Sequence, residues 1–403
     1  MDSKTVCRPV SAMYHLSALY AQDDNPSKVD LLIGYYKTEQ SDIYALPVVQ
    51  RVETLVTQQI KNHKYLPLLG SEHFVRDACQ LLYGQDVKER LNNGTVFGVQ
   101  TIGCTGGMRV GADLLVSHMN CTTFYVSDPT WENHRLIFLS SGFLKAKTYR
   151  YWNEANKCLD FEGLCEDLSD APSKSVIVLQ ACGHNPTSLD PSKKQWERIA
   201  DIIQQRHLIP FFDIAYQGFA TGNTDKDAWV IRYFVSRGIE LLCAQSFSKN
   251  FGLYNERVGN LSFSLNSSDY TAAYKSQIEL SIRSSYSSAP NHGALTVHTI
   301  MNDNGLREEW LLTLKNMYDR VNGLRHTLRE LLEKSDAPGS WSHITDGKGM
   351  FSYLGITENQ VEHLRTKFHV YVSLTGRINL CSLNDNNIGY VAKSIASTLK
   401  EVQ

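Results

Sequence analysis

Two short apolar runs on either side of an amphipathic stretch constrain the fold of this chain more than any other feature. The runs occupy residues 174–188 (KSVIVLQACGHNPTS) and 207–216 (HLIPFFDIAY), and residues 193–206 between them repeat apolar side chains at helical spacing. A strand, a helix and a strand in this order pair in parallel through a right-handed crossover. The chain is therefore predicted to be an α/β protein with a central, mostly parallel sheet flanked by helices.

The rest of the chain extends this pattern and adds a second domain. Residues 122–131 (TTFYVSDPTW) and 239–245 (IELLCAQ) are typical of further strands. Residues 306–335 form one long amphipathic pattern with interleaved charges, and two short strands and a final helix are expected after it. We predict an N-terminal arm of residues 1–12, a large domain of residues 41–315, and a smaller α/β domain made of residues 13–40 and 316–403.

Composition narrows the class of protein. The chain has 403 residues, of which 42% are hydrophobic and 20% charged, with a formal net charge of -2, so it is globular and has no basic surface for nucleic acid or anionic membrane. Nine cysteines without a C-x-x-C pair indicate reduced thiols in a cytoplasmic protein, and no metal site is expected. The N-terminal stretch has no signal-peptide pattern, and no apolar run reaches the length of a membrane span.

Four polar or charged side chains follow predicted strands: Asp128, Asn185, Asp213 and Lys249. In open α/β sheets, ligands bind outside the carboxyl ends of the strands, so these groups are expected to share one site. Lys249 stands out because a lysine beside a buried strand is costly unless its charge is paired. Two interpretations stay open for it: a surface lysine just past a strand, or a reactive amine suited to forming an imine with a carbonyl.

Four residues at or near this edge suit a flat heterocycle. A carboxylate in apolar surroundings needs a cationic partner, and a protonated ring nitrogen would be such a partner for Asp213. Tyr216 and Asn185 would hydrogen-bond a phenolate-type oxygen, and Trp131 would stack on the ring. Taken singly, Asp213 could equally be a helix N-cap and Trp131 a core residue.

Two sets of residues near this edge could bind a phosphate. Ser246, Ser248 and Arg257 cluster around Lys249, and hydroxyls with an arginine suit a phosphate. The stretch TGGMRVGADLL, from Thr105, is predicted to be a glycine-rich loop entering a helix, whose N–H groups would cradle an anion. The glycines could instead serve a turn, and Arg257 a surface ion pair. A pyridoxal phosphate site needs an amine, a carboxylate, a phosphate-binding group and an aromatic ring that covers the cofactor. The residues named above supply all four, so together they predict such a site.

Five stretches carry a resemblance to a known family: SFSKNFGLYNERVGNL, FFDIAYQGFA, HNPT, SDPTWENH and NHKYLPLLG. They resemble the aspartate aminotransferases, which are class I, fold-type I pyridoxal phosphate enzymes, and the eukaryotic cytosolic form most of all. The likeness runs from about Met13 to the C-terminus. It implies a fold-type I transferase, a cytoplasmic homodimer with shared active sites, and transfer of an amino group between L-aspartate and 2-oxoglutarate, which gives oxaloacetate and L-glutamate by ping-pong half-reactions.

The resemblance also implies a role for each matching residue. Lys249 would hold the cofactor as a Schiff base and shuttle the proton, Asp213 would pair with the pyridinium nitrogen, and Tyr216 and Asn185 would bond the ring oxygen. The phosphate would be bound by Thr105, Ser246, Arg257, the Gly103–Cys104 loop and, from the neighbouring subunit, Tyr65. The substrate would contact Gly34, Trp131, Asn185 and two arginines, with Arg377 on its α-carboxylate and Arg283 on its distal carboxylate across the dimer interface.

Departures from the family pattern leave two alternatives open. They are Gly103 and Cys104 in the phosphate loop, Gln180 where the family has a histidine near the ring aspartate, Ser188, Ser288 and Tyr35. We expect weaker phosphate anchoring, which Gly103→Ser with Cys104→Gly would restore. One alternative is a transaminase of shifted specificity, for aromatic, kynurenine-like or sulfur amino acids. The other is a low-activity paralogue that binds the cofactor and acts as a scaffold.

Overall fold

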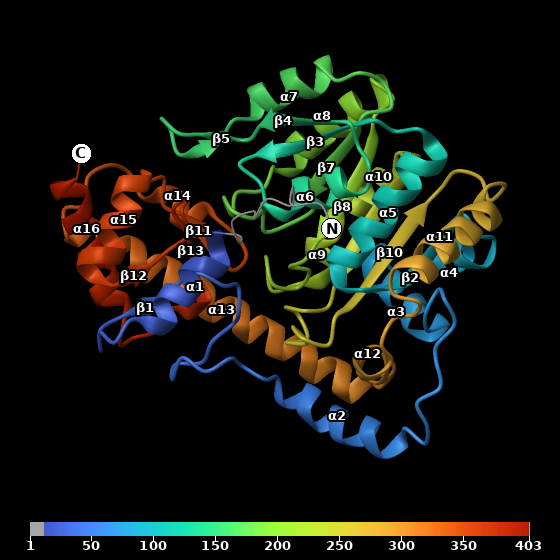
Figure 1. Ribbon diagram of the computed structural model, residues 1–403, viewed down its shortest axis with the longest axis horizontal. Coiled ribbons are helices and arrows are strands. Elements are labelled where there is room, and N and C mark those ends of the chain that lie inside the picture. The colour runs from blue at the N-terminus through green and yellow to red at the C-terminus, as the bar shows by residue number, and fades with distance from the viewer. Residues whose placement is uncertain (1–11, 403) are drawn as a thin grey trace, which may run out of the picture. The chain divides into compact units, whose positions relative to one another are not determined.

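The computed structural model describes residues 12–402 of the chain (Figure 1). The predicted N-terminal arm, residues 1–12, lies outside the described residues except for its last member. Among the described helices, none is long and apolar enough to cross a membrane.

The described elements alternate along much of the chain. The strands are β1 (Val29–Asp30), β2 (Val96–Ile102), β3 (Thr123–Asp128), β4 (Lys145–Arg150), β5 (Trp152–Asn153), β6 (Cys158–Leu159), β7 (Val176–Gln180), β8 (Ile209–Ile214), β9 (Leu241–Ser246), β10 (Val258–Ser264), β11 (Phe351–Tyr353), β12 (Val370–Tyr371) and β13 (Arg377–Asn379). The helices are α1 (Ala12–Gln22), α2 (Pro47–Gln59), α3 (Glu72–Tyr83), α4 (Val87–Asn92), α5 (Gly103–Met119), α6 (Asn133–Ser140), α7 (Phe161–Asp170), α8 (Lys193–Gln205), α9 (Thr224–Asp227), α10 (Trp229–Ser236), α11 (Thr271–Ser285), α12 (His292–Asn302), α13 (Asn304–Lys334), α14 (Ser342–Asp346), α15 (Glu358–Phe368) and α16 (Ile388–Glu401), with a 3-10 turn η1 (Leu380–Ser382).

The central sheet confirms the α/β prediction. Its seven strands lie in the order β2-β10-β9-β8-β7-β3-β4. β10 is antiparallel to both of its neighbours, and the other neighbouring pairs are parallel. The predicted strand–helix–strand unit is present as β7, α8 and β8, and it places Gln180 beside Asp213 in the register. β7 and β9 are buried along their whole length, as expected for strands covered on both faces.

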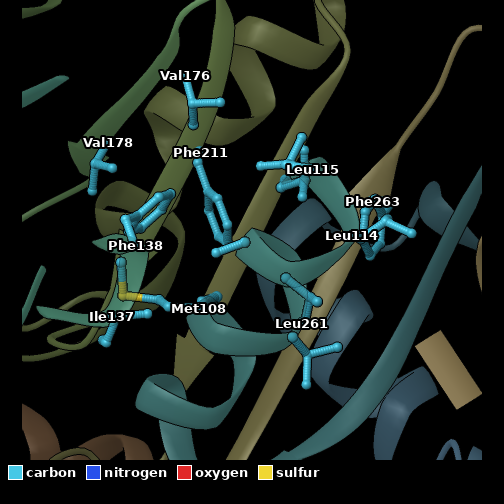
Figure 2. Close-up of a cluster of buried hydrophobic side chains, with 14 of the residues drawn as sticks. Met108, Leu114, Leu115, Ile137, Phe138, Val176, Val178, Phe211, Leu261 and Phe263 are labelled. Atoms are coloured by element: carbon cyan, nitrogen blue, oxygen red, sulfur yellow. The ribbon is translucent and has the colours of Figure 1, made fainter. Parts of the chain in front are cut away.

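Two consecutive phenylalanines of β8 show how both faces are covered. Neighbouring residues of a strand point to opposite faces. The ring centre of Phe211 lies 5.6 Å from that of Phe138 in α6 (Figure 2). Phe212 meets Phe234 of α10 at 5.0 Å and Trp196 of α8 at 6.1 Å, on the other face. Helices α5 and α6 therefore cover one face of β8, and α8 and α10 cover the other.

Helix α5 lies close against the Phe211 ring of the sheet at Gly111. A Cβ atom built on Gly111 would stand 2.6 Å from Cζ of Phe211, so only a glycine allows this approach. The residues around this contact include Met108, Leu114, Leu115, Val176 and Leu261, which belong to one buried hydrophobic cluster (Figure 2). This packing holds the N-terminal end of α5 at the carboxyl end of β2.

The prediction of a glycine-rich loop from Thr105 is wrong. Helix α5 already begins at Gly103, so Gly106 and Gly107 lie inside its first turns. The cause is tertiary packing, which overrides the low helix propensity of glycine. The backbone N–H groups expected to face an anion are therefore those of the helix start itself.

The chain divides into two compact units. The larger unit contains residues 45–185 and 189–319, with the seven-stranded sheet. The smaller unit contains the described residues up to Tyr44, Pro186–Ser188 and the chain from Arg320 on. It has two small sheets, in which β1 pairs with β12 in parallel and β11 pairs with β13 antiparallel. The domain boundaries given in the sequence analysis stay a prediction.

Candidate active site

A buried carboxylate stands near the carboxyl end of the central strand β8. Asp213 is 7% exposed. Its Oδ1 accepts a hydrogen bond from Cys104 Sγ at 3.0 Å, and its Oδ2 lies 3.1 Å from His134 Nε2. Cys104 comes from the first turn of α5 and His134 from the first turn of α6. Each oxygen of this carboxylate thus has its own hydrogen-bond partner, which offsets part of the cost of burying it.

His134 is a site residue that the sequence analysis did not single out. Its Nδ1 lies 2.8 Å from Thr130 Oγ1, and this bond orients the ring so that Nε2 faces Asp213. The tautomer with hydrogen on Nε2 satisfies both contacts, because the Thr130 hydroxyl then donates to Nδ1. The histidine belongs to the SDPTWENH stretch, three residues after Trp131. Its proximity to Trp131 is the sequence feature from which it could have been predicted as a site residue.

Gln180 neighbours Asp213 in the sheet register, but its side chain bonds to the backbone of Asn185. Its side-chain amide donates to the carbonyl of Asn185 at 3.0 Å and accepts from the N–H of Asn185 at 2.8 Å. This pair of bonds closes the loop after β7 and fixes the backbone of Asn185, whose side chain is buried. Gln180 therefore shapes the loop that carries a predicted ring-oxygen ligand.

Lys249 follows β9, the parallel neighbour of β8. β9 ends at Ser246, and Ala244 pairs with Asp213 in the register, so the turn that carries Lys249 begins at the same edge of the sheet. Lys249 is half-buried, and its Nζ lies 5.8 Å from the centre of the Tyr216 ring. Tyr216 is 5% exposed. The amine of Lys249 and the phenol of Tyr216, which the sequence analysis placed in the same site, thus lie close together.

The turn after Tyr216 depends on a buried carboxylate in α9. Asp227 Oδ2 accepts from the N–H groups of Gly218 at 2.7 Å and Ala220 at 3.1 Å, and Oδ1 accepts from Thr221 Oγ1 at 2.6 Å. Burial raises the pKa of Asp227 to about 6 in spite of these bonds. Asp227 thereby holds the backbone that positions Tyr216.

A candidate anion-binding site, called here the anion cradle, is formed by Arg257 and the start of α5 at Gly103. Gly103 has a φ of +73°, and a Cβ atom on it would stand 2.5 Å from Nη2 of Arg257. The Arg257 guanidinium is held there by its Nη1, which donates to the carbonyl of Tyr254 at 2.9 Å and to Ser248 Oγ at 3.4 Å. A helix start and a guanidinium that meet at one point suit a phosphate. Thr105 lies in the same first turn of α5, and Ser246 ends the neighbouring strand β9.

These residues fit the pyridoxal phosphate that the sequence predicted. The Asp213 carboxylate and the Lys249 amine lie at the carboxyl ends of β8 and β9, and the anion cradle lies at the start of α5. Trp131 is half-buried and contacts His134 edge to face, with ring centres 5.2 Å apart. Asp128 ends β3 as an exposed residue with no predicted cofactor role. Within the described residues, no group of three His, Cys, Asp or Glu side chains is arranged to hold a metal.

Two predicted site residues lie on the surface of the larger unit. Tyr65 is 85% exposed. Arg283, near the C-terminal end of α11, is exposed and donates from Nη1 to Ser287 Oγ at 2.7 Å, one turn further on. Neither is built into the cluster around Asp213, so their assignment to the site stays a prediction that depends on a second subunit.

The smaller unit contains the other predicted substrate residues. Arg377, in β13, is 8% exposed, donates from Nη2 to the carbonyl of Leu32 at 2.6 Å and places its guanidinium carbon 4.1 Å from the ring centre of Phe351. Gly34 meets the same ring, since a Cβ atom there would stand 2.6 Å from Phe351 Cζ. Ser188 adopts a φ of +64° and donates from its hydroxyl to the carbonyl of Phe351. The Arg377 guanidinium therefore packs on the ring of Phe351.

Comparison with known proteins places this geometry in context. The family model "Aminotransferase class I and II" matches residues 26–395. The cytoplasmic aspartate aminotransferase of Gallus gallus is 45% identical over 401 residues, which cover 98% of this chain and 97% of that protein.

Two solved structures are similar over almost the whole chain. The aspartate aminotransferase from Saccharomyces cerevisiae cytoplasm has a TM-score of 0.96 at 36% identity, covering 99% of this chain and 98% of that one. An aromatic-amino-acid aminotransferase from Burkholderia pseudomallei, covalently bound to pyridoxal phosphate, has a TM-score of 0.95 at 35% identity, covering 98% of this chain and 99% of that one.

Proposed function

Because this chain belongs to the aminotransferase class I and II family, we propose that it is an aspartate aminotransferase that uses pyridoxal 5'-phosphate. It transfers the amino group between L-aspartate and 2-oxoglutarate and forms oxaloacetate and L-glutamate. It is a cytoplasmic enzyme, like the curated relatives that carry this word in their names.

One observation carries the proposal: a buried, doubly hydrogen-bonded carboxylate stands at the same sheet edge as a lysine. Asp213 has a donor on each oxygen, and Lys249 follows the neighbouring parallel strand. When bound, the cofactor supplies an electron sink for the carbanion character that develops at the substrate α-carbon. Asp213 is proposed to keep the ring nitrogen protonated, and Lys249 is proposed to anchor the cofactor and to move the proton at that carbon.

The other proposed cofactor residues have separate tasks. Arg257, Ser246, Thr105 and the N–H groups of Gly103 and Cys104 bind the phosphate at the start of α5. Tyr216 and Asn185 hydrogen-bond the ring oxygen, and Trp131 covers the ring face. The helix start favours the anion through its unpaired N–H groups and its dipole.

Substrate choice is assigned to two arginines. Arg377 binds the α-carboxylate by a bidentate fork, and the Phe351 ring and the Leu32 carbonyl hold its guanidinium in place. Arg283 is exposed in its own chain. We therefore propose that Arg283 binds the distal carboxylate in the active site of a second copy in a homodimer, as Tyr65 reaches the phosphate there. Gly34 leaves room for the substrate beside Arg377.

The decisive experiment is an absorbance titration of purified protein reconstituted with pyridoxal phosphate. We expect a cofactor band near the visible edge that falls when aspartate is added and returns with 2-oxoglutarate. The Lys249→Ala variant is the control and is expected to lose the response. A cofactor band that does not change when aspartate is added would contradict the substrate assignment. A protein that binds no cofactor would favour the alternative in which the chain acts as a scaffold.

The same titration separates aspartate from the aromatic substrates of some structural relatives. Tyr35 is half-buried beside Gly34, and its carbonyl accepts from Asn379 Nδ2 at 2.8 Å. If phenylalanine or kynurenine bleached the band at lower concentration than aspartate, the specificity proposed here would be wrong. The amino-acid preference would then have to be assigned to pocket residues such as Tyr35 and Ser288.

A further inference from the structure

We propose that Cys104 is a positioning residue for Asp213, which fixes the carboxylate and makes it a weaker hydrogen-bond acceptor toward the ring nitrogen of the cofactor. This inference rests on the proposed function, because it concerns the carboxylate that faces the cofactor. The chemistry involved is a thiol hydrogen bond, and no covalent step is required.

The first support is geometric. The Cys104 sulfur lies 3.0 Å from Asp213 Oδ1, and its second possible acceptor, the Ala244 carbonyl, lies farther away at 3.4 Å. A thiol has one hydrogen to donate, and a carboxylate is a stronger acceptor than a neutral carbonyl. Distance and charge therefore both direct the S–H group toward Asp213.

The second support is the protonation state of the sulfur. Cys104 is 9% exposed, and burial together with the adjacent Asp213 carboxylate raises the pKa of its thiol well above the ordinary value. A thiol of this kind keeps its proton at neutral pH and acts as a donor. It is a poor nucleophile for the same reason, since the thiolate is the reactive form.

The consequence for Asp213 follows from the arrangement of both donors. His134 approaches Oδ2 and Cys104 approaches Oδ1, from two different helices, so rotation of the carboxylate would break one bond or the other. Each donor also draws negative charge onto its own oxygen lone pair. Less charge then remains for a third partner, so the bond from a protonated ring nitrogen becomes weaker than with His134 alone.

A purely structural role is the competing explanation, because Cys104 also belongs to the buried hydrophobic cluster under α5. A matched pair of variants separates the two. Cys104→Ser keeps a donor, and Cys104→Ala removes it, while both shorten the side chain. A packing role predicts equal or greater damage from serine, whereas the hydrogen-bond role predicts that serine resembles the wild type.

The first measurement is the infrared S–H stretch of the full-length holoenzyme. The difference spectrum between wild type and Cys104→Ala isolates the Cys104 band from those of the other cysteines. We expect this band at lower frequency than the mean of the remaining thiols, and we expect it to rise in Asp213→Asn, whose amide oxygen accepts more weakly. A band at the frequency of an unbonded thiol would overturn the proposal.

The second measurement is the nitrogen NMR shift of ring-labelled cofactor in the holoenzyme. Cys104→Ala is expected to move this shift toward a stronger bond with Asp213, and Cys104→Ser to leave it near the wild-type value. Equal shifts in all three proteins, or the same displacement in alanine and serine variants, would refute the proposal. If the protein bound no cofactor, the proposed function would fail. The infrared test, repeated on the full-length protein without cofactor, would still show whether the Cys104–Asp213 bond exists.

Discussion

At the scale of single residues, the start of α5 is the place where we propose that the phosphate is held. Gly103 adopts a φ of +73° and lies against the Arg257 guanidinium, so the missing side chain makes room for an arginine. The sequence analysis expected the double change Gly103→Ser with Cys104→Gly to strengthen anchoring. The geometry argues against its serine half, because a Cβ atom at Gly103 would stand 2.5 Å from Nη2 of Arg257.

We therefore predict that Gly103→Ser weakens cofactor retention. A left-handed φ costs a serine about 1 kcal/mol, and displacement of Arg257 removes a charge-assisted hydrogen bond that contributes roughly 1.5–3 kcal/mol. Cofactor absorbance should decay on dialysis at least about tenfold faster than in wild type. Gly389→Ser is the control, because no atom lies within 4 Å of a Cβ there. Retention equal to that of the control would show that Arg257 does not depend on Gly103.

A second residue-scale prediction concerns pH. The pKa of Asp227 is raised to about 6, from an ordinary value of 3.8. The folded state therefore holds this proton more tightly than the unfolded chain between roughly pH 4 and 6, and stability from this group falls as pH rises through that window. The effect amounts to ~3 kcal/mol at most.

Asp227→Asn should flatten the dependence of the unfolding midpoint on pH between roughly 4 and 6, because the amide does not titrate. Thermal unfolding followed by circular dichroism measures this. Asp225→Asn, in the same short helix but with a side chain that is 73% exposed, is the matched control. A variant whose slope equals that of the wild type would mean that Asp227 is ionised throughout, as its three donors alone would favour.

At the scale of elements, the closeness of α5 to the sheet is the property that most affects the site. The helix carries Gly103, Cys104 and Thr105 at one end and is pressed on Phe211 at Gly111. A shift of the helix would move all three groups together. The anion cradle and the Cys104–Asp213 bond are therefore expected to respond jointly to packing changes under the helix.

Gly111→Ala tests this directly. Its Cβ would stand 2.6 Å from the Phe211 ring, so we expect a loss of about 1–3 kcal/mol in unfolding free energy and weaker cofactor binding. Gly323→Ala, in the exposed face of α13 with nothing within 4 Å, should instead stabilise by about 0.5–1 kcal/mol. Chemical unfolding of both variants measures these changes in unfolding free energy. A neutral Gly111→Ala would mean that the helix can move away at no cost.

At the scale of the whole molecule, the proposed homodimer assigns the exposed Tyr65 and Arg283 to the active site of a second copy of the chain. Mixing two inactive variants, Lys249→Ala and Arg283→Ala, provides the test. If the sites are shared, a mixed dimer has one site with both an intact Lys249 and an intact Arg283. Statistical mixing should then restore about a quarter of wild-type activity.

The control for this mixing experiment is each variant refolded alone, which should stay inactive. Sedimentation analysis of tagged chains must confirm that mixed dimers have formed. Mixed dimers without activity would contradict the assignment of Arg283 to the partner's site. Activity in a sample that contains only monomers would contradict the dimer itself.

The sequence by itself determined the fold class, the cofactor and the family. Strand and helix patterns are local, so residues 174–216 already predicted β7, α8 and β8. Lys249, Asp213 and Arg257 stand in long motifs whose residue order is specific to one family. Such motifs survive as contiguous strings because the turns that follow the strands carry the chemistry.

Only the tertiary structure decided which side chains surround Asp213. Cys104 is 109 residues away in the chain and His134 is 79 residues away, and both reach the carboxylate because α5 and α6 cover the same face of β8. Local periodicity contains no information on such contacts, since they depend on strand order and helix placement. The Gly103–Arg257 contact joins residues that are far apart in the sequence, so it too could be seen only in the structure. The bonds from Gln180 to Asn185 depend on the conformation of the loop after β7, which the sequence pattern does not specify.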